Sequence, residues 1–271
     1  MTNDPGAPDD LNAATIEAAL RGRLGRPLRY LDEAASTNSE ALEWARAGAP
    51  EGALVVAGHQ TAGRGRWGRD WFSPPGTALT FSLVLRPPLD PSSAGLLTAA
   101  VGVACAVGIG SSSALRPRLK WPNDVMLDGR KVAGILLESR VEAGRIGAAV
   151  AGVGVNVMTL TNAPSDIAQR ATAIADHVDR PPSRAVLLAD ILAALEDLYR
   201  DAASFGFAER VTEEATGLSD VLGRRVMVRL AGGGSLEGRA ERLTPRGELE
   251  VRTEDAVVTV HSGEIERLRT S

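Results

Sequence analysis

The sequence predicts an α/β domain followed by a small all-β domain. Up to about residue 215, apolar segments with helical spacing alternate with short apolar runs that are typical of buried strands. From residue 216 onward, only short strand-like segments separated by turns remain, which favours a small barrel. A length of 271 residues is sufficient for one large and one small domain. We therefore expect a disordered tail over residues 1–10, a main domain over 11–215 and a barrel over 216–271.

The first half of the main domain predicts two helices and two strands. A polar start with two prolines predicts the disordered tail. Thr37 is expected to cap the second helix, because Glu40 follows three residues later as a capping box requires. Gly48 and Pro50 are expected to end that helix. The predicted elements are helix 11–24, a helix beginning in 36–40, strand 53–57 and strand 77–85.

The second half continues the alternation and then changes character. Ser183 is the expected cap of an amphipathic helix with leucines at helical spacing. The predicted elements of the main domain are helix 94–109, a strand–turn–strand over 119–127, strands 132–138 and 148–157, and helix 185–199. The barrel is expected to contain strands 225–230, 235–241, 248–253 and 257–261.

Composition excludes several classes of function. Apolar residues make up 44% and charged residues 24%, as in ordinary soluble proteins. The net charge of −4 argues against non-specific nucleic-acid binding. Cys105 lies in an apolar run and is expected to be a small buried hydrophobe. The three histidines are far apart, so a zinc site is not expected. With neither a signal peptide nor an uninterrupted run of about eighteen apolar residues, we expect a cytoplasmic protein without a transmembrane helix.

The most informative segment is the loop Gly63-Arg64-Gly65-Arg66-Trp67-Gly68-Arg69. Glycine lets backbone N–H groups approach a ligand closely, and arginine supplies a planar cationic fork for phosphate or carboxylate. We expect this loop to close over an anion, and to be disordered without one because unpaired arginines repel each other. A flexible surface hairpin is the plain alternative. Stacking on single-stranded nucleic acid is another, although the loop is short and the rest of the chain acidic.

Three further segments carry polar side chains at strand ends. Lys120-Trp121-Pro122-Asn123-Asp124 forms a turn, in which Asp124 can orient a lysine or hold a magnesium ion that arrives with phosphates. Lys131 begins a strand in which Gly134 permits close approach of a ligand, and its ammonium can neutralise developing negative charge. Asn156 follows a strand with two glycines and suits a neutral amide ligand. Each segment also has an ordinary interpretation, as a solvated turn or strand end.

Taken together, these motifs resemble biotin protein ligases. The resemblance rests on Ser36-Thr37-Asn38, Gln60, the 63–69 loop, Lys120–Asp124, Lys131 with Ala133-Gly134-Ile135, and Gly154-Val155-Asn156, and it runs from about Leu28 to the C-terminus. It implies an α/β (α+β) fold: a class II aminoacyl-tRNA synthetase-like mixed-sheet catalytic domain followed by a small SH3-like β-barrel. It also implies formation of biotinyl-5′-AMP from biotin and ATP, and transfer of biotin to a lysine of a carrier domain. Because about ten residues precede the first expected helix, the chain resembles the ligase-only group without an N-terminal DNA-binding domain.

The resemblance also implies roles for individual residues. Lys131, Arg66 and Arg64 would be catalytic by stabilising negative charge. Biotin would contact Ser36, Thr37, Asn38, Gln60, Gly63, Arg64, Gly65, Arg66, Lys131, Gly134 and Leu136. ATP or the adenylate would contact Arg66, Arg69, Trp71, Asn123, Asp124, Lys131 and Asn156. Mg²⁺ would enter with ATP.

The implied partner is the biotin carboxyl carrier domain of an acyl-CoA, acetyl-CoA or pyruvate carboxylase. DNA and membranes are not expected partners, and the chain is expected to be a monomer or a weak homodimer. A lipoate or octanoate ligase is the closest alternative, because those enzymes resemble the same catalytic domain. A nucleic-acid-binding repressor is the alternative from another class, supported by the basic stretches Arg224-Arg225 and Arg239–Arg246.

Overall fold

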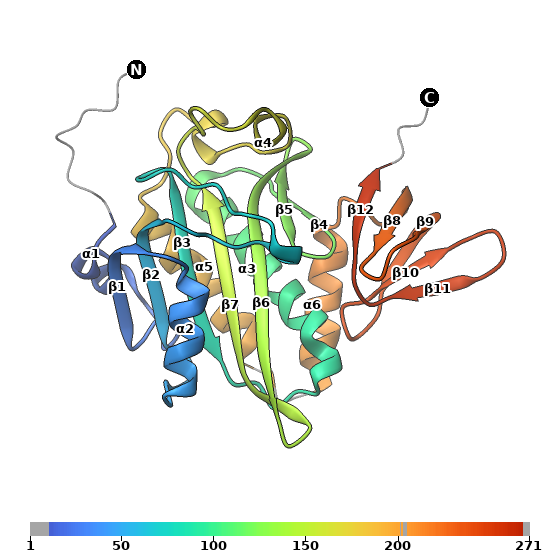
Figure 1. Cartoon of the computed structure of the whole chain (residues 1–271), viewed down its shortest axis with the longest axis horizontal. Coiled ribbons are helices and arrows are strands. Elements are labelled where there is room, and N and C mark those ends of the chain that lie inside the picture. The colour runs from blue at the N-terminus through green and yellow to red at the C-terminus, as the bar shows by residue number, and fades with distance from the viewer. Residues whose placement is uncertain (1–10, 201, 203–204, 268–271) are drawn as a thin grey trace.

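The computed structural model describes residues 11–200, 202 and 205–267, so the predicted disordered tail lies outside the described residues. Its centre is a seven-stranded mixed sheet (Figure 1). In spatial order the strands are β1 (Leu28–Ala34), β2 (Leu54–Gln60), β3 (Ala78–Leu85), β7 (Arg145–Asn156), β6 (Arg130–Glu142), β5 (Asp124–Leu127) and β4 (Arg118–Lys120). β1 and β2 are parallel and the other neighbours are antiparallel.

Helices cover both faces of this sheet. α2 (Thr37–Arg46) lies on one face, and α3 (Ala94–Ser113) and α5 (Arg184–Tyr199) lie on the other (Figure 1). The strand residues alternate accordingly, because successive side chains point to opposite faces. In β2, Leu54 and Val56 join the larger core with α3 and α5, whereas Val55 packs with the alanines of α2. The remaining helical segments are α1 (Ala13–Ala19), η1 (Arg66–Gly68), η2 (Pro91–Ser93), α4 (Ser165–Arg170), η3 (Ile174–Asp176) and α6 (Phe205–Leu218).

α3 is the most apolar helix of the core. By length and composition alone, the segment Pro91–Ser113 is apolar enough to cross a membrane, with a mean hydropathy of 1.8. Glycine, serine and threonine residues interrupt this segment, so it is not the uninterrupted apolar run that the sequence was expected to lack. Most of the segment is buried inside the molecule, and α3 packs against α5, α6 and β6. Its apolarity is explained by this central position in the core.

A second, five-stranded antiparallel sheet follows α6. Its order is β11 (Val257–Val260), β10 (Leu249–Arg252), β9 (Ser235–Leu243), β8 (Arg225–Leu230) and β12 (Gly263–Arg267). Alternate residues of these strands, such as Val226, Val228 and Val251, form a separate apolar core. The predicted fold class is confirmed: a mixed α/β sheet followed by a small antiparallel unit. Helix α6 runs through residue 216, and the second sheet begins at Arg225.

Several local predictions were wrong in detail. α1 is shorter than predicted, because the chain leaves helical geometry at Leu20. Thr37 is not the cap of α2. The cap position is Ser36, whose side chain makes no capping hydrogen bond, while Thr37 bonds to Gln60 instead. Ser183 does occupy the cap position of α5, but its side chain makes no capping hydrogen bond either.

Candidate active site

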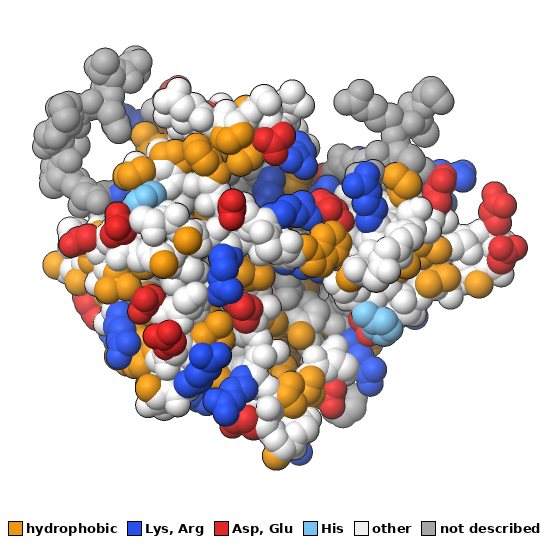
Figure 2. Space-filling view, viewed as in Figure 1, with side chains coloured by type: hydrophobic (Ala, Val, Ile, Leu, Met, Phe, Trp, Pro, Cys, Tyr) orange, Lys and Arg blue, Asp and Glu red, His pale blue; other side chains and the backbone are white. Residues whose placement is uncertain are grey.

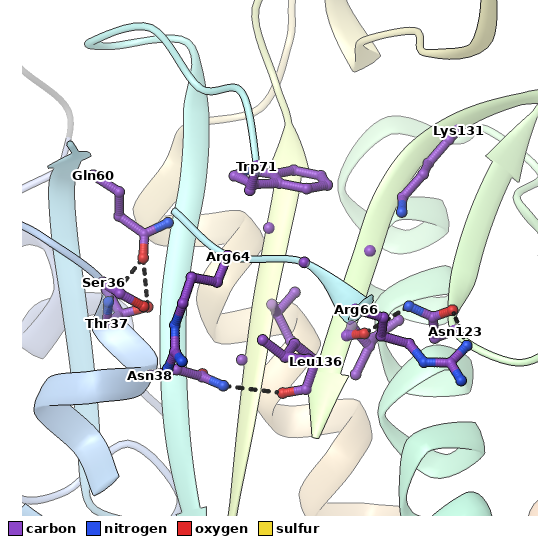
Figure 3. Close-up of a pocket in the computed structure, with 16 residues that line it drawn as sticks. Ser36, Thr37, Asn38, Gln60, Arg64, Arg66, Trp71, Asn123, Lys131 and Leu136 are labelled. Carbon is purple, nitrogen blue, oxygen red and sulfur yellow. Dashed lines mark hydrogen bonds between the residues drawn. The ribbon is translucent and has the colours of Figure 1, made fainter. Parts of the chain in front are cut away.

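One cavity lies on the α2 face of the main sheet, where β6 and β7 meet the segment that connects β2 to β3. It encloses about 440 Å³, including space open to solvent. Figure 3 shows the cavity with side chains pointing into it from α2, β2, β6 and the loop. The lining residues are Ser36, Thr37, Asn38, Gln60, Arg64, Gly65, Arg66, Trp71, Asn123, Lys131, Gly134, Ile135, Leu136, Gly152, Val153 and Gly154.

Glycines form part of the floor of the cavity and let Trp71 lie against the sheet. Gly134 in β6 and Gly154 in β7 are paired across the two strands. A Cβ atom at Gly154 would lie 2.4 Å from the Trp71 Cε2 atom, and one at Gly134 would lie 3.2 Å from its Cζ3 atom. Any other residue at Gly154 would therefore displace the indole. The Trp71 Nε1 atom is buried and has no hydrogen-bond partner in the structure.

An uncharged polar network forms one end of the cavity. The Gln60 Oε1 atom accepts hydrogen bonds from the Thr37 backbone N–H at 2.8 Å and from the Thr37 hydroxyl at 3.1 Å. The Asn38 amide donates to the Leu136 carbonyl at 3.3 Å (Figure 3). The Ser82 hydroxyl lies 2.6 Å from Asn38 Oδ1 and 2.8 Å from Thr37 Oγ1. Thr37, Asn38 and Ser82 are buried and Gln60 is half-buried, and hydrogen bonds hold all four side chains in place. They can therefore recognise a neutral polar group by its shape.

Glu138 connects this network to the arginine loop. Its Oε2 atom accepts from the Asn38 amide at 2.8 Å and from the Arg64 guanidinium at 3.1 Å. Sequence reasoning missed both Glu138 and Ser82. Neither residue was assigned a role in the site. Ser82 is a buried polar residue in a largely apolar strand, and Glu138 lies where β6 changes from apolar to polar, which was the available signal.

Three cations line the cavity: Arg64, Arg66 and Lys131. The Lys131 Nζ atom lies 2.5 Å from Asp124 Oδ1. The Arg66 guanidinium donates to Asn123 Oδ1 and to the Gly263 carbonyl, both at 3.3 Å. Burial lowers the pKa of Arg66, although the Asp124 carboxylate acts in the opposite direction. No carboxylate is among the lining residues, so the cavity favours an anionic ligand.

The loop that carries these arginines has a defined conformation. Arg66 also bonds to the Ser262 hydroxyl at 2.8 Å, and Arg69 forms a two-pronged ion pair with Glu264 at 2.9 and 2.7 Å. Each of the three arginines thus has a partner. The physical reason given for expecting a disordered loop, repulsion between unpaired arginines, does not apply to this structure.

The structure brings most of the predicted site residues together, but not all. Gly63, Arg69, Asp124 and Asn156 are not among the cavity-lining residues. Gly63 accepts a backbone hydrogen bond from Trp71, and Asp124 lies behind Lys131. Arg69 pairs with the second sheet instead. Asn156 is only 3% exposed and donates its amide to the Thr172 carbonyl. Its predicted contact with a nucleotide stays a prediction.

The structure offers little for metal or thiol chemistry. Among the residues described here, no group of three or more His, Cys, Asp or Glu side chains is arranged to hold a metal ion. Cys105 is fully buried in α3, and burial raises the pKa of its thiol to about 12. That thiol is protonated at neutral pH and has no access to the cavity, so it cannot act as a nucleophile.

The fold and the cavity together define an α/β protein whose cavity suits a small ligand with both a neutral polar and an anionic part. Comparison with known proteins is consistent with this class. The model of the "Biotin/lipoate A/B protein ligase family" matches residues 32–156. The model of the "Biotin protein ligase C terminal domain" matches residues 221–268.

Relatives extend the match to nearly the whole chain. The biotin--[acetyl-CoA-carboxylase] ligase of Mycobacterium tuberculosis is 34% identical over 96% of this chain and 98% of its own length. The bifunctional ligase/repressor BirA of Bacillus subtilis is 33% identical over 96% of this chain and 80% of its own length. The biotin protein ligase of Aquifex aeolicus, solved with biotin and ATP, has a TM-score of 0.75 at 27% identity and covers 90% of this chain and 100% of its own. The chain belongs to the biotin/lipoate A/B protein ligase family.

Proposed function

We propose that this chain is a biotin protein ligase that joins biotin and ATP to form biotinyl-5′-AMP and then transfers biotin to a lysine of a carrier domain. The observation that carries the proposal is the convergence of Arg64, Arg66 and Lys131 on a cavity whose other end is a neutral hydrogen-bonding network. The proposal also draws on relatives named biotin--[acetyl-CoA-carboxylase] ligase and on structures solved with biotin and ATP or with biotinyl-5-AMP.

In the first step, an oxygen of the biotin carboxylate attacks the α-phosphorus of ATP. A new O–P bond forms, and the bond to the β-phosphate oxygen breaks to release pyrophosphate. Both reactants are anions, and two unit charges about 4 Å apart repel by about 4 kcal/mol at an effective dielectric constant of 20. Arg64, Arg66 and Lys131 would offset this repulsion and stabilise the charge that develops on the phosphate.

In the second step, the amine of the carrier lysine attacks the acyl carbon of biotinyl-5′-AMP. A C–N bond forms, the C–O bond to AMP breaks, and the amine loses its proton to solvent. Lys131 would stabilise the phosphate of the departing AMP. Since no covalent enzyme intermediate is required, catalysis rests on positioning and electrostatics.

The neutral end of the cavity would hold the biotin rings. Because Gln60 Oε1 is occupied by Thr37, its amide nitrogen is left directed toward the cavity (Figure 3). An amide donor at this place suits the carbonyl oxygen of a ureido group. Ser36, Asn38, Gly134 and Leu136 would surround the same rings, with Gly63 and Gly65 shaping the loop above them.

The nucleotide would lie toward Asn123 and Trp71, with Arg69 and Asn156 as more distant contacts. Trp71 offers a large aromatic surface within the cavity. Mg²⁺ would arrive on the ATP phosphates, which would supply most of its oxygen ligands, with Asp124 as one protein carboxylate nearby. The likeness to relatives named biotin--[acetyl-CoA-carboxylase] ligase supports a carboxylase carrier domain as the partner. A cytoplasmic location and a monomeric or weakly dimeric state stay predictions.

The proposal is tested by incubating the chain with biotin, ATP, Mg²⁺ and an isolated biotin carboxyl carrier domain, and measuring the mass of the carrier. We expect the carrier to gain one biotinyl group, and a carrier whose target lysine is replaced by arginine to gain none. The same reaction with lipoate in place of biotin tests the closest alternative. An unmodified carrier with biotin, or a lipoyl adduct formed faster than the biotinyl one, would refute the proposal.

A further inference from the structure

Trp67 occupies an unusual backbone position at the tip of the arginine loop. It has φ 59° and ψ 33°, and Gly68 after it has φ 71°. The Arg69 backbone N–H donates to the Arg66 carbonyl at 3.3 Å. Positive φ at both central residues with this hydrogen bond is a type I′ turn, whose central positions ordinarily hold glycine, asparagine or aspartate. Tryptophan at the first of them stores backbone strain.

The indole of Trp67 is only partly buried. It is 46% exposed, so much of its apolar surface faces solvent. The guanidinium carbons of Arg66 and Arg69 lie 5.2 and 5.5 Å from its ring centroid. Both arginines are already fixed by the second sheet, through Ser262 and Glu264, so the indole is not required to place them. Backbone strain at an exposed loop residue is characteristic of functional sites.

Trp67 adjoins residues that line the cavity, although it does not line the cavity itself. Arg64, Gly65 and Arg66 line the cavity and Trp67 follows them directly in the chain. The segment that ends at η1 crosses the front of β7 and β6 on the same face as α2 (Figure 1). Figure 2 shows hydrophobic surface next to Lys and Arg side chains where this segment ends. A partner that reaches into the cavity from this face would meet the indole.

We propose that Trp67 is a docking contact for the protein that carries the acceptor lysine. This inference rests on the proposed function, which requires a protein lysine to reach an acyl adenylate inside the cavity. A lysine side chain reaches only a limited distance from its backbone. The protein surface around the acceptor lysine must therefore contact the surface around the cavity. A rigidly presented tryptophan flanked by arginines has the composition of a binding hot spot, since Trp and Arg are enriched there. The two small substrates, which bind inside the cavity, do not require the exposed face of the indole.

The test uses the full chain with Trp67→Asn, which keeps a residue that tolerates this backbone conformation. A second variant, Trp67→Phe, retains a smaller aromatic ring. Val141→Asn is the matched control, because Val141 is another exposed apolar residue and lies at the far tip of the β6–β7 hairpin. Three quantities are measured for each variant. They are the biotin-dependent exchange of pyrophosphate into ATP without carrier, the trapping of the adenylate by hydroxylamine, and KM and kcat for an isolated biotin carboxyl carrier domain.

For Trp67→Asn we expect exchange and hydroxylamine trapping within twofold of the unmodified chain, and a KM for the carrier raised about tenfold, as for truncation of a hot-spot residue. Trp67→Phe should fall between, and Val141→Asn should change none of the three quantities. An unchanged carrier KM, or a loss of exchange equal to the loss of transfer, overturns the docking role. A dimer that dissociates on the same substitution, detected by sedimentation, would assign the indole to a second copy and also overturns it. If the unmodified chain shows no exchange at all, the proposed function itself fails.

Discussion

At the scale of single residues, each cation of the site has a partner in the chain but keeps hydrogen-bond donors that a ligand can use. An ammonium group has three N–H donors, and the Asp124 carboxylate oxygen at 2.5 Å occupies one donor of Lys131. The remaining donors are available to a ligand in the cavity. Arg64 is similar, because one of its nitrogens reaches Glu138 and Ser39 while its side chain stays 45% exposed. Each cation is thus oriented in advance and can still bind an anion.

Replacement of Lys131 by alanine should therefore remove catalysis without unfolding the chain. Loss of a charge-stabilising donor costs about 10²–10³-fold in rate, and we expect a loss of this size in biotin-dependent pyrophosphate–ATP exchange. Circular dichroism should stay unchanged. Arg130→Ala is the matched control, because Arg130 is a neighbouring but exposed cation of the same strand, and its exchange rate should stay within twofold. Near-normal exchange with Lys131→Ala would exclude this ammonium from the mechanism.

The sequence predicted these charged residues better than it predicted the residues that orient the site through hydrogen bonds. Arg64, Arg66 and Lys131 belong to short motifs whose residue types indicate anion binding, and all three line one cavity. Glu138 and Ser82 orient their neighbours only because β3, β7 and β6 are adjacent in the sheet. That adjacency is a long-range property which local patterns do not contain. Asn156 is a buried polar residue bonded to the Thr172 carbonyl, and its contact with a nucleotide stays a prediction.

At the scale of elements, the segments that the sequence missed depend on packing. β1 mixes polar and apolar residues and forms an edge strand with β2 as its one partner in the main sheet. α6 contains Gly206, Thr212 and Gly217, which are weak helix formers, but Val211 and Ala215 are buried in the core. The change of composition near residue 216 falls inside this helix. Tertiary burial therefore outweighs local propensity in both elements.

The end of α2 shows how one side chain can fix an element next to the cavity. The Arg86 guanidinium donates to the carbonyl of Ala45, in the last turn of α2, to that of Ala49, three residues after the helix, and to the Gly147 carbonyl in β7. The Ala45 carbonyl has no further helical turn to satisfy it. Arg86 thereby connects α2, whose other end carries the neutral network of the cavity, to the main sheet.

Arg86→Met should destabilise the fold. It leaves carbonyl groups without their charged donor, and one unsatisfied buried group costs about 1–3 kcal/mol. We expect the urea midpoint to fall while the slope of the transition stays the same. Arg46→Met is the matched control, because Arg46 is an exposed arginine in the last turn of the same helix, and it should change stability by less than about 0.5 kcal/mol. Equal midpoints for the two variants would show that Arg86 does not hold the helix end.

At the scale of the whole molecule, the second sheet is in contact with the first domain rather than tethered beside it. The Trp121 Nε1 atom donates to the Gly247 carbonyl at 3.0 Å. Gly95 and Gly247 are so close that a Cβ atom at Gly247 would lie 2.4 Å from the Gly95 carbonyl carbon. The second sheet also contacts the arginine loop, through Ser262 with Arg66 and Glu264 with Arg69. The sequence predicted a second domain, but contacts between residues 195 or 196 positions apart could not be inferred from local patterns. The second sheet therefore takes part in positioning the arginines of this loop.

Substitution of Glu264, which pairs with Arg69, tests whether the second sheet positions the arginine loop. Burial opposes ionisation of Glu264, but the hydrogen bonds and charge of Arg69 outweigh it and hold the pKa of Glu264 below its usual value. A carboxyl group with a lowered pKa stabilises the folded state above its unfolded pKa, and this contribution disappears as the pH falls through the folded value. The difference in thermal stability between the unmodified chain and Glu264→Gln should thus be constant from about pH 8 to 5 and vanish only below about pH 4.

The same substitution should affect the loop at neutral pH. An exposed ion pair contributes at most about 1 kcal/mol, so Glu264→Gln should raise the KM for ATP by no more than about fivefold in the exchange reaction. Glu237→Gln is the matched control, because Glu237 pairs with Arg225 on the same sheet without touching the loop. If both variants show the same small change, the second sheet does not position the arginines. The double-mutant test adds Arg69→Gln to the unmodified chain and to Glu264→Gln. If Glu264→Gln raises the KM for ATP only when Arg69 is present, the effect depends on this ion pair, because two residues that act together show non-additive losses.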